Sequence, residues 1–381
     1  MEKYLLEQME ICGRTFCGYC REGCPVLREL EFESFSMRGK LMLLRELLKG
    51  KLQPSRDLAE RFYACVCCSQ CSTRCPAELD TISLIEASRA YLVELGLVPP
   101  KVRDFLENIS KHGNPWKLPR RKRGEWAKGM RIRQYEPGDE FLYYVGCTGS
   151  YNTRGNEAAR ALGEVLLKGG VSFGVLGSNE ICDGNDVKML GEEGLFELLA
   201  DHNIRMFKKL GVKKIVTLSP HAYNAIKNYY PQYGGKFEVR HYTQLLWEII
   251  KGGKLDISKG LKARVTYHDP CFLGRHNKVY DAPREILRSI SGIELVEMER
   301  NRENSFCCGG GSANFYTGLL GGRENSPNRI RVREAYDTGA EILAVACPIC
   351  RIMLEDAIKE EELEGKLTVK CISEIVRESC Y

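Results

Sequence analysis

The stretch that decides the class of this chain is Cys65–Pro76, CVCCSQCSTRCP. Its cysteines at positions 65, 68, 71 and 75 have the C-x2-C-x2-C-x3-C-P spacing of a cubane iron–sulfur site. Three thiolates spaced in this way wrap one loop around three corners of an Fe4S4 cube, while in two-cluster proteins the Cys before Pro ligates the other cluster. The stretch therefore predicts electron transfer and requires a second motif.

A second motif lies upstream, at Cys17, Cys20 and Cys24-Pro25. The first cysteine of this motif is expected at position 14, which is an arginine, so we assign that role to Cys12, the nearest cysteine upstream. Because the Cys before each Pro serves the neighbouring cluster, we expect two cubane clusters with crossed ligands. The expected ligands are Cys12, Cys17, Cys20 and Cys75 for the first cubane, and Cys65, Cys68, Cys71 and Cys24 for the second.

Structural zinc and a disulfide framework are the alternatives. Disulfide scaffolds are typical of short secreted chains, whereas this chain has 381 residues and its cysteines are bunched in motifs. Met1–Gly13 does not have the pattern of a signal segment. Zinc usually takes four ligands from two CxxC pairs, and two complete runs exceed that need. We expect a cytoplasmic protein that contacts a membrane only through a partner.

Length and charge narrow the class further. At one domain per about 150 residues the chain predicts two or three domains, and no run of about 18 apolar residues occurs. The net charge of +5 is too small to indicate nucleic acid. Positive charge is concentrated in Lys117–Arg133, which we interpret as a solvated linker; a docking surface for an acidic partner or anionic lipid is the alternative.

The residue pattern divides the chain into four parts. Residues 1–112 predict an all-helical two-cluster ferredoxin-like module, with helices at Met37–Leu48 and Thr81–Leu95. A basic linker at 113–138 follows. Strands and helices then alternate over 139–255 and again over 256–381, which predicts two tandem Rossmann-like α/β domains with parallel sheets. The expected fold class is therefore α + α/β.

The alternating segments mark these two domains as copies. The expected strands of the first copy are 141–145, 171–176 and 214–218, with helices at 156–168 and 194–210; those of the second are 264–267, 294–298 and 341–346, with helices at 282–291 and 329–338. Cys271 follows Cys147 by 124 residues, and Cys307 follows Cys182 by 125. We infer an internal duplication.

The second copy carries five cysteines at expected strand ends, where open α/β sheets collect ligands. They are Cys271, the adjacent pair Cys307 and Cys308, and Cys347 and Cys350 in CPIC. Adjacent cysteines do not easily bind one tetrahedral metal, so the pair favours a multi-iron cluster, with zinc as the alternative. We expect Gly309 and Gly310 to let the backbone approach this cofactor.

The layout resembles the family that joins an N-terminal ferredoxin-like module to tandem cysteine-rich CCG domains. This family includes the D-type subunit of heterodisulfide reductase and, more distantly, the iron–sulfur subunits of anaerobic glycerol-3-phosphate dehydrogenase and glycolate oxidase. The motifs that carry the resemblance are CVCCSQCSTRCP, ESFSMRGKLMLL, YHDPCFLGRH, SFCCGGGSA and ACPIC. The resemblance implies a noncubane Fe4S4 cluster on the five cysteines of the second copy, at which a disulfide is cleaved.

The first copy departs from this pattern. Asp183 replaces the second Cys of the pair, and Ser219-Pro220-His221-Ala222 stands where CPxC is expected. We expect this copy to be empty and structural; a pocket or another metal site formed by Cys182, Asp183 and His221 is the alternative.

Several polar residues near the second-copy motif are candidates for chemistry. His268 is suited to donate a proton when thiolates leave, although His268 and Asp269 are equally suited to hydrogen-bond a strand-end loop. Arg275 and His276 are candidates for holding an anionic substrate, with a surface role as the alternative.

Two functions remain. In the first, the chain is the catalytic oxidoreductase component of a heterodisulfide-type reductase, which reduces a small-molecule disulfide of the CoM-S-S-CoB type. In the second, it is an electron-transfer subunit of a flavin-dependent glycerol-3-phosphate, glycolate or lactate dehydrogenase. Either requires a redox partner, which we expect to be a b-type cytochrome, a flavoprotein or a hydrogenase or ferredoxin donor, in anaerobic metabolism.

Overall fold

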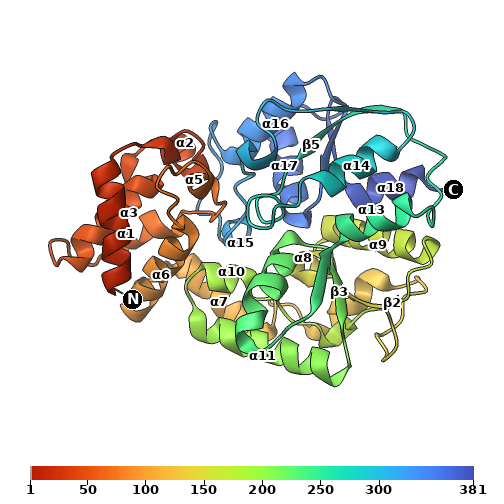
Figure 1. Ribbon diagram of the computed structural model, residues 1–381, viewed down its shortest axis with the longest axis horizontal. Helices are drawn as coiled ribbons and strands as arrows, with labels where there is room; N and C mark the ends of the chain where they lie inside the picture. Colours follow the sequence, from red (N-terminus) through yellow and green to blue (C-terminus); the bar gives the residue numbers. More distant parts are fainter. Residues whose placement is uncertain (1) are drawn as a thin grey trace.

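A computed structural model describes residues 2–381. It shows a helical module at one end of the molecule and two α/β domains side by side at the other (Figure 1). Each α/β domain contains one four-stranded parallel sheet. The predicted fold class is confirmed.

The helical module contains seven α-helices. Ser36 caps one of them, because its Oγ accepts the backbone N–H of Gly39 over 2.9 Å, and Ser55 and Asp80 cap two others in the same way. The predicted helix at Met37–Leu48 has those bounds, and the one predicted from Thr81 ends at Glu94. The helices are α1 (Glu2–Thr15), α2 (Pro25–Leu30), α3 (Met37–Leu48), α4 (Arg56–Tyr63), α5 (Gln70–Thr73), α6 (Thr81–Glu94) and α7 (Pro100–His112).

The first α/β domain has the strand order β2-β1-β3-β4, with every neighbouring pair parallel. Its strands are β1 (Phe141–Tyr144), β2 (Phe173–Gly174), β3 (Lys214–Thr217) and β4 (Glu238–His241). Its helices are α8 (Gly146–Tyr151), α9 (Thr153–Lys168), α10 (Asn185–Met189), α11 (Glu193–Lys209), α12 (Pro220–Asn224) and α13 (Tyr242–Lys251).

The second domain repeats this topology as β6-β5-β7-β8, again parallel. Its strands are β5 (Ala263–His268), β6 (Ile293–Val296), β7 (Ile342–Val345) and β8 (Thr368–Cys371). Its helices are α14 (Asp281–Ser289), α15 (Asn314–Thr317), α16 (Pro327–Asp337), α17 (Pro348–Glu360) and α18 (Ile372–Ser379). The fourth strand of each sheet, β4 or β8, is not among the strands expected from sequence.

Two apolar cores connect the parts. One runs from the helical module into the first α/β domain, and the other is shared by the two α/β domains. Helix α18 packs against α9, and Ser373 Oγ donates to the carbonyl of Ala158 over 3.1 Å. In residues 2–381 no helix combines the length and apolarity needed to cross a membrane.

The interpretation of the basic segment as solvated holds for most of its basic side chains but is wrong for Arg123. Arg120–Ala127 forms a short 3-10 helix, in which Arg123 and Trp126 are buried. The guanidinium of Arg123 pairs with Glu180 over 2.8 Å, and the indole of Trp126 packs edge-on against Tyr143. A buried charge persists only when it is paired, so the Glu180 carboxylate explains why this basic residue lies inside.

Candidate iron–sulfur sites

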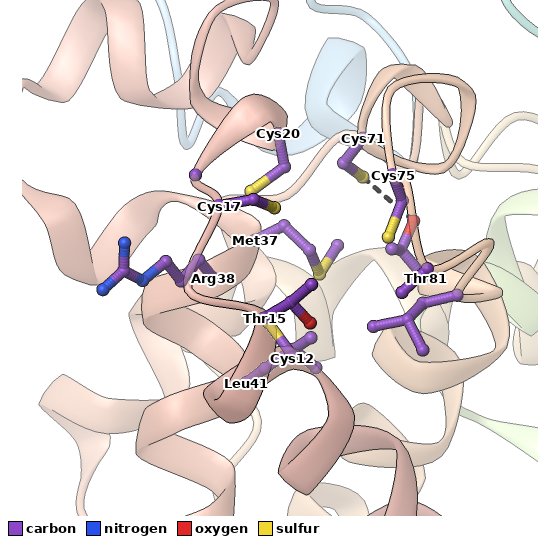
Figure 2. Close-up of a pocket in the computed structure, with 13 residues that line it drawn as sticks. Cys12, Thr15, Cys17, Cys20, Met37, Arg38, Leu41, Cys71, Cys75 and Thr81 are labelled. Carbon is purple, nitrogen blue, oxygen red and sulfur yellow. Dashed lines mark hydrogen bonds between the residues drawn. The ribbon is translucent and has the colours of Figure 1, made fainter.

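The cysteines expected to hold the first cubane line one pocket of the helical module (Figure 2). Helix α1 supplies Cys12, the loop after it supplies Cys17 and Cys20, and the segment after α5 supplies Cys75. Burial and the neighbouring thiols of Cys20 and Cys75 raise the pKa of Cys12 to about 11. Cys12 therefore lies among the other three cysteines, as its assignment as a ligand requires.

The cysteines expected to hold the second cubane line a separate pocket. Cys24 lies there with Cys65 and Cys68, whereas Cys75 does not, so the structure has the crossed arrangement of the two motifs. Cys71 lines both pockets, and its Sγ lies 2.9 Å from the hydroxyl of Thr81. Burial raises the pKa of Cys24 to about 11.

Arg89 of α6 fixes the loop that carries the second motif. Its guanidinium is fully buried and donates to the carbonyls of Phe62, Tyr63 and Cys65. It also donates to the carbonyl of Met189 in the first α/β domain over 2.7 Å and to the hydroxyl of Ser312 in the second. One side chain therefore connects all three parts of the molecule. The Sγ of Cys67 accepts from the same guanidinium over 3.4 Å, as a packed thiol would.

The five cysteines of the second α/β domain meet beyond the carboxyl ends of its strands. Cys271 follows β5, Cys307 and Cys308 follow β6, and Cys347 follows β7 and precedes α17. The Sγ atoms of Cys307 and Cys271 lie 4.0 Å apart, and those of Cys308 and Cys350 lie 3.4 Å apart. All five side chains are buried, none more than 6% exposed.

The glycines after the cysteine pair have different local roles. Gly309 has a left-handed φ of 84°, and its N–H donates to the Sγ of Cys307 over 3.4 Å. A Cβ on Gly310 would lie 2.7 Å from Ile349 Cγ2, so this glycine lets the loop approach α17. Gly309 therefore contacts the sulfur of Cys307, whereas Gly310 packs against Ile349.

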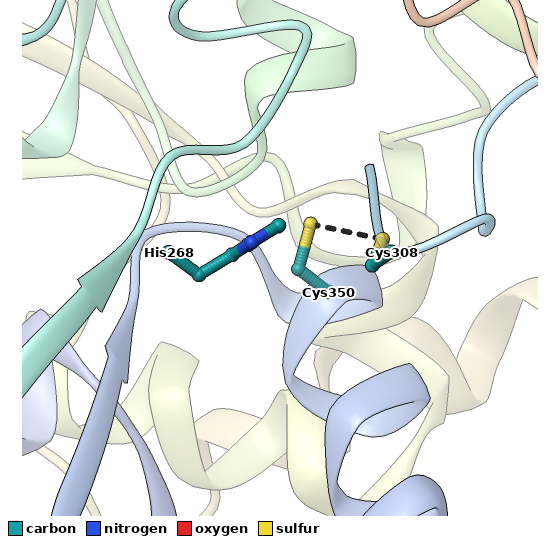
Figure 3. A group of neighbouring side chains, drawn as sticks. All are labelled: His268, Cys308 and Cys350. Atoms are coloured by element: carbon teal, nitrogen blue, oxygen red, sulfur yellow. Dashed lines mark hydrogen bonds between the residues drawn. The ribbon is translucent and has the colours of Figure 1, made fainter. Parts of the chain in front are cut away.

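His268 at the end of β5 faces two of these cysteines (Figure 3). One ring nitrogen of His268 and the Sγ atoms of Cys308 and Cys350 all lie within 4.8 Å of one another. Across residues 2–381, no other group of three or more potential metal ligands meets this distance. The Nε–H of Arg331 donates to His268 Nδ1 over 3.1 Å. In a neutral imidazole one nitrogen accepts and the other donates, so the proton is on Nε2, which is buried without a partner.

Asp269, by contrast, has a structural role. Its carboxylate forms a two-pronged pair with Arg284, at 2.7 and 2.8 Å, and accepts the backbone N–H of Arg302. Of the two interpretations of the His268-Asp269 pair, the strand-end role fits Asp269, while His268 points to the cysteines.

The alternative of a surface role is wrong for Arg275, whose buried side chain has only Nη2 without a partner; binding of an anionic ligand by Arg275 and His276 stays a prediction. Arg275 is buried and donates from Nε to the carbonyl of Cys68 and from Nη1 to that of Ser305, both over 2.6 Å. His276 Nε2 lies 2.8 Å from the carbonyl oxygen of Cys67, and burial lowers the His276 pKa to about 4. Both side chains fasten the second-motif loop to the second α/β domain.

The thiols of Cys68 and Cys307 interact across this junction, and this interaction is the main cause that raises the pKa of Cys68 well above its usual value. Gly311 of the second α/β domain approaches the same loop closely, since a Cβ on it would lie 2.6 Å from the carbonyl oxygen of Val66. The loop of the second cubane motif therefore lies against the loop that follows the adjacent cysteine pair.

In the first α/β domain, Cys147, Cys182, Asp183 and His221 line one pocket. His221 Nδ1 lies 3.2 Å from Asp186 Oδ1, and its ring packs 4.4 Å from that of Phe272 in the second domain. Against the effect of burial, Asp186 and then the thiol of Cys347 raise the pKa of His221 well above its usual value. The first domain thus contributes a side chain to the second-domain site, a feature that the sequence pattern did not indicate.

Unpaired donors test whether iron–sulfur clusters fit these sites. The buried nitrogens Nη2 of Arg275 and Nε2 of His268 have no hydrogen-bond partner, and neither has the side-chain amide of Gln70 in the second pocket. Buried donors are rarely left unsatisfied. Thiolate and sulfide sulfurs are acceptors, so clusters bound by the surrounding cysteines fit these donors.

Comparisons with known proteins agree with this organisation. Residues 141–227 and 265–355 match the cysteine-rich domain family CCG, and residues 9–79 match a 4Fe-4S dicluster domain. The chain is 32% identical over 403 residues to the D-type subunit of the dihydromethanophenazine:CoB–CoM heterodisulfide reductase of Methanosarcina barkeri, covering 98% of this chain and 94% of that protein.

Two further relatives are longer proteins. The chain is 39% identical over 333 residues to the probable iron-sulfur-binding oxidoreductase FadF of Bacillus subtilis. It is 36% identical over 331 residues to the EtfAB:quinone oxidoreductase of Syntrophomonas wolfei. Each match covers 84% of this chain and 46% of the relative, so the chain spans about half the length of these two proteins.

Proposed function

The chain belongs to the iron–sulfur oxidoreductase family that includes the D-type subunit of heterodisulfide reductase, and on that premise we propose that it carries electrons through two cubane clusters to a disulfide-reducing site in its second CCG repeat. The observation that carries this proposal is the pair of hydrogen bonds by which Arg275 and His276 of the second repeat hold the backbone carbonyls of Cys68 and Cys67. These bonds support a short path between the proposed second cubane and the proposed CCG cluster.

The proposed ligands are those expected from the motifs. Cys12, Cys17, Cys20 and Cys75 hold the first cubane, and Cys24, Cys65, Cys68 and Cys71 hold the second. The noncubane cluster is held by Cys271, Cys307, Cys308, Cys347 and Cys350. When bound, such a cluster supplies single electrons and an iron that can take a substrate sulfur. The pocket of the first cubane lies nearer the protein surface than the CCG cysteines do, since Cys17 is exposed and the five CCG cysteines are buried.

His268 is the proposed hydrogen-bond donor to the reacting sulfur at this site. Cleavage of a disulfide to two thiols takes up two electrons and two protons. The Nε2–H of His268 is buried, faces Cys308 and Cys350, and has no other acceptor. Arg331 holds the ring in this orientation through Nδ1, so His268 can hydrogen-bond a thiolate sulfur as charge develops on it.

Anaerobic turnover tests the proposal. The reconstituted protein, reduced by dithionite through a viologen, should consume a small-molecule disulfide, and Cys308→Ser should lose that activity while the cubane spectra persist. Cys380→Ser is the matched control, because Cys380 is buried far along the chain from every motif. Equal turnover by Cys308→Ser and Cys380→Ser would overturn the assignment of the active site.

A second function is favoured by one specific observation. The relatives named as an EtfAB:quinone oxidoreductase and FadF are 36% and 39% identical to this chain, above the 32% of the heterodisulfide reductase relative. In this second function the chain relays electrons from a flavoprotein dehydrogenase towards quinone. Flavoprotein-dependent quinone reduction that survives without disulfide turnover would favour the relay.

Either function requires a redox partner. We propose a b-type cytochrome, a flavoprotein or a ferredoxin-type donor, and a cytoplasmic location in which any membrane contact is made by that partner.

A further inference from the structure

The surface beside the first cubane pocket differs from the rest of the molecule. Cys17 is exposed, whereas the other cysteines are buried or half-buried. Three exposed large apolar side chains lie within nine residues of sequence around it: Ile11, Phe16 and Tyr19, which are 42%, 69% and 53% exposed. We call Ile11, Arg14, Phe16, Cys17 and Tyr19 the Cys17 face.

Phe16 has an unfavourable backbone for an exposed aromatic residue. Its φ of 52° lies in the left-handed region, which bulky side chains rarely adopt. The ring of Phe16 is exposed, and the guanidinium of Arg38 lies over it, 3.8 Å from the ring centroid. Strain of this kind persists where the fold over-determines it, and it clusters at functional positions.

The charged side chains of this surface favour a partner with a negatively charged contact surface. Arg21 pairs with Glu33 and Arg74 pairs with Glu22, while Glu29 is buried and accepts the N–H of Gly321. Within residues 11–38, Arg14, Arg28 and Arg38 make no ion pair among the described side chains, and of the two carboxylates without one, Glu29 is buried and only Glu31 is exposed. The surface therefore presents an excess of unpaired guanidinium groups.

We propose that the Cys17 face is the docking surface for an electron-donor protein whose contact surface is acidic. The proposal rests on the function above, because the first cubane is the cluster nearest this surface. The donor's reduced one-electron cofactor transfers one electron per encounter to the first cubane, and the oxidised donor then leaves. Apolar side chains supply the contact area, and the guanidinium groups steer an acidic partner into place.

The experiment uses the reconstituted full chain and a reduced acidic [2Fe–2S] ferredoxin as the probe. Stopped-flow absorbance follows reduction of the cubane clusters. Phe16→Asn removes the ring with a residue that tolerates the left-handed backbone, and Arg14→Glu reverses one charge. Leu198→Asn on α11 and Arg103→Glu on α7 are matched controls, because both positions are exposed and lie outside this face.

The expected result is a fall of about tenfold or more in the ferredoxin-driven rate for Phe16→Asn and Arg14→Glu, with little change in the controls. The wild-type rate should fall as salt is added. Reduction by dithionite should be equal in all variants, which shows that the clusters are intact.

Unchanged ferredoxin-driven rates in both face variants would overturn the proposal, as would a wild-type protein that dithionite reduces and ferredoxin does not. Loss of binding to anionic vesicles by Arg14→Glu, without any loss of the ferredoxin rate, would identify a membrane contact instead. Disulfide turnover is measured separately with dithionite, so failure of the proposed reductase function is distinguishable from failure of docking.

Discussion

The guanidinium of Arg275 donates a hydrogen bond from Nε to the backbone carbonyl of Cys68 over 2.6 Å. These residues belong to different domains, and the bond fastens the second cubane motif to the CCG repeat. Beside it, His276 Nε2 lies 2.8 Å from the carbonyl oxygen of Cys67. The junction between the electron-carrying module and the proposed active site is therefore held by direct hydrogen bonds.

Replacing Arg275 by Met should loosen this junction. The variant loses the buried donors to Cys68 and Ser305, and hydrogen bonds from a charged group contribute about 1.5–3 kcal/mol each. We expect slower electron passage to the CCG cluster with normal reduction of the cubanes, followed by freeze-quench paramagnetic resonance. Arg288→Met, at an exposed position of α14, is the control; equal rates in the two variants would contradict the role of Arg275.

Arg89→Lys should lower the stability of the whole molecule. Lysine keeps the charge but lacks the planar fork that reaches carbonyls in all three parts. We expect a loss of about 2–4 kcal/mol in the free energy of unfolding, since several buried acceptors lose their donor. Chemical denaturation measures it, with Arg103→Lys as the exposed control. A loss below about 0.5 kcal/mol, typical of surface positions, would show that Arg89 is not a shared anchor.

His241 should make stability depend on pH. Burial lowers its pKa to about 3, below the value of about 6.5 in unfolded chains. The unfolded state therefore binds the proton first: the stability contribution is fully present above about pH 6.5 and is lost as pH falls towards 3, at up to about 1.4 kcal/mol per pH unit. His241→Gln should flatten the slope between about pH 5 and 6.5. A slope that this variant leaves unchanged would assign the effect to other groups.

His268→Leu should impair the proposed chemistry. Leucine has no side-chain donor, so the ligand sulfurs lose the Nε2–H and the CCG cluster should become harder to reduce. Disulfide turnover should fall by about 10²-fold or more, because a developing thiolate loses a preorganised hydrogen-bond donor. Potentiometry checks the first effect and kinetics the second. His202→Leu, on α11, is the control, and an unchanged potential would show that His268 does not donate to the cluster.

The sequence was most informative where a spacing or a period fixes the geometry. The two cysteine motifs predicted the crossed pockets, because Cys24 and Cys75 each directly precede a proline, the position that ligates the neighbouring cluster. The alternation of strands and helices predicted both parallel sheets. The strands β4 and β8 were missed because they are short edge strands with charged or polar residues at alternate positions, such as Glu238 and Arg240.

Long-range partners could not be predicted from local pattern. Arg123 lies in a basic run that indicates a solvated segment, yet it is buried because it pairs with Glu180, 57 residues later. Arg275 was a candidate for substrate binding because its acceptor, the Cys68 carbonyl, lies 207 residues away. The side chains of Arg89 and Arg331 belong to no motif, and a signal for them would have required knowing which domain surfaces meet.

The central claim is that a third, thiol-responsive cluster is held by the second CCG repeat at the end of two cubanes. The most direct measurement combines iron and zinc analysis of the anaerobically reconstituted protein with paramagnetic resonance of its oxidised form, with and without a thiol. We predict iron for three Fe4S4 clusters and a thiol-dependent signal that Cys308→Ser abolishes and Cys380→Ser retains. Stoichiometric zinc with only two cubanes, and no signal that responds to thiol, would contradict the account.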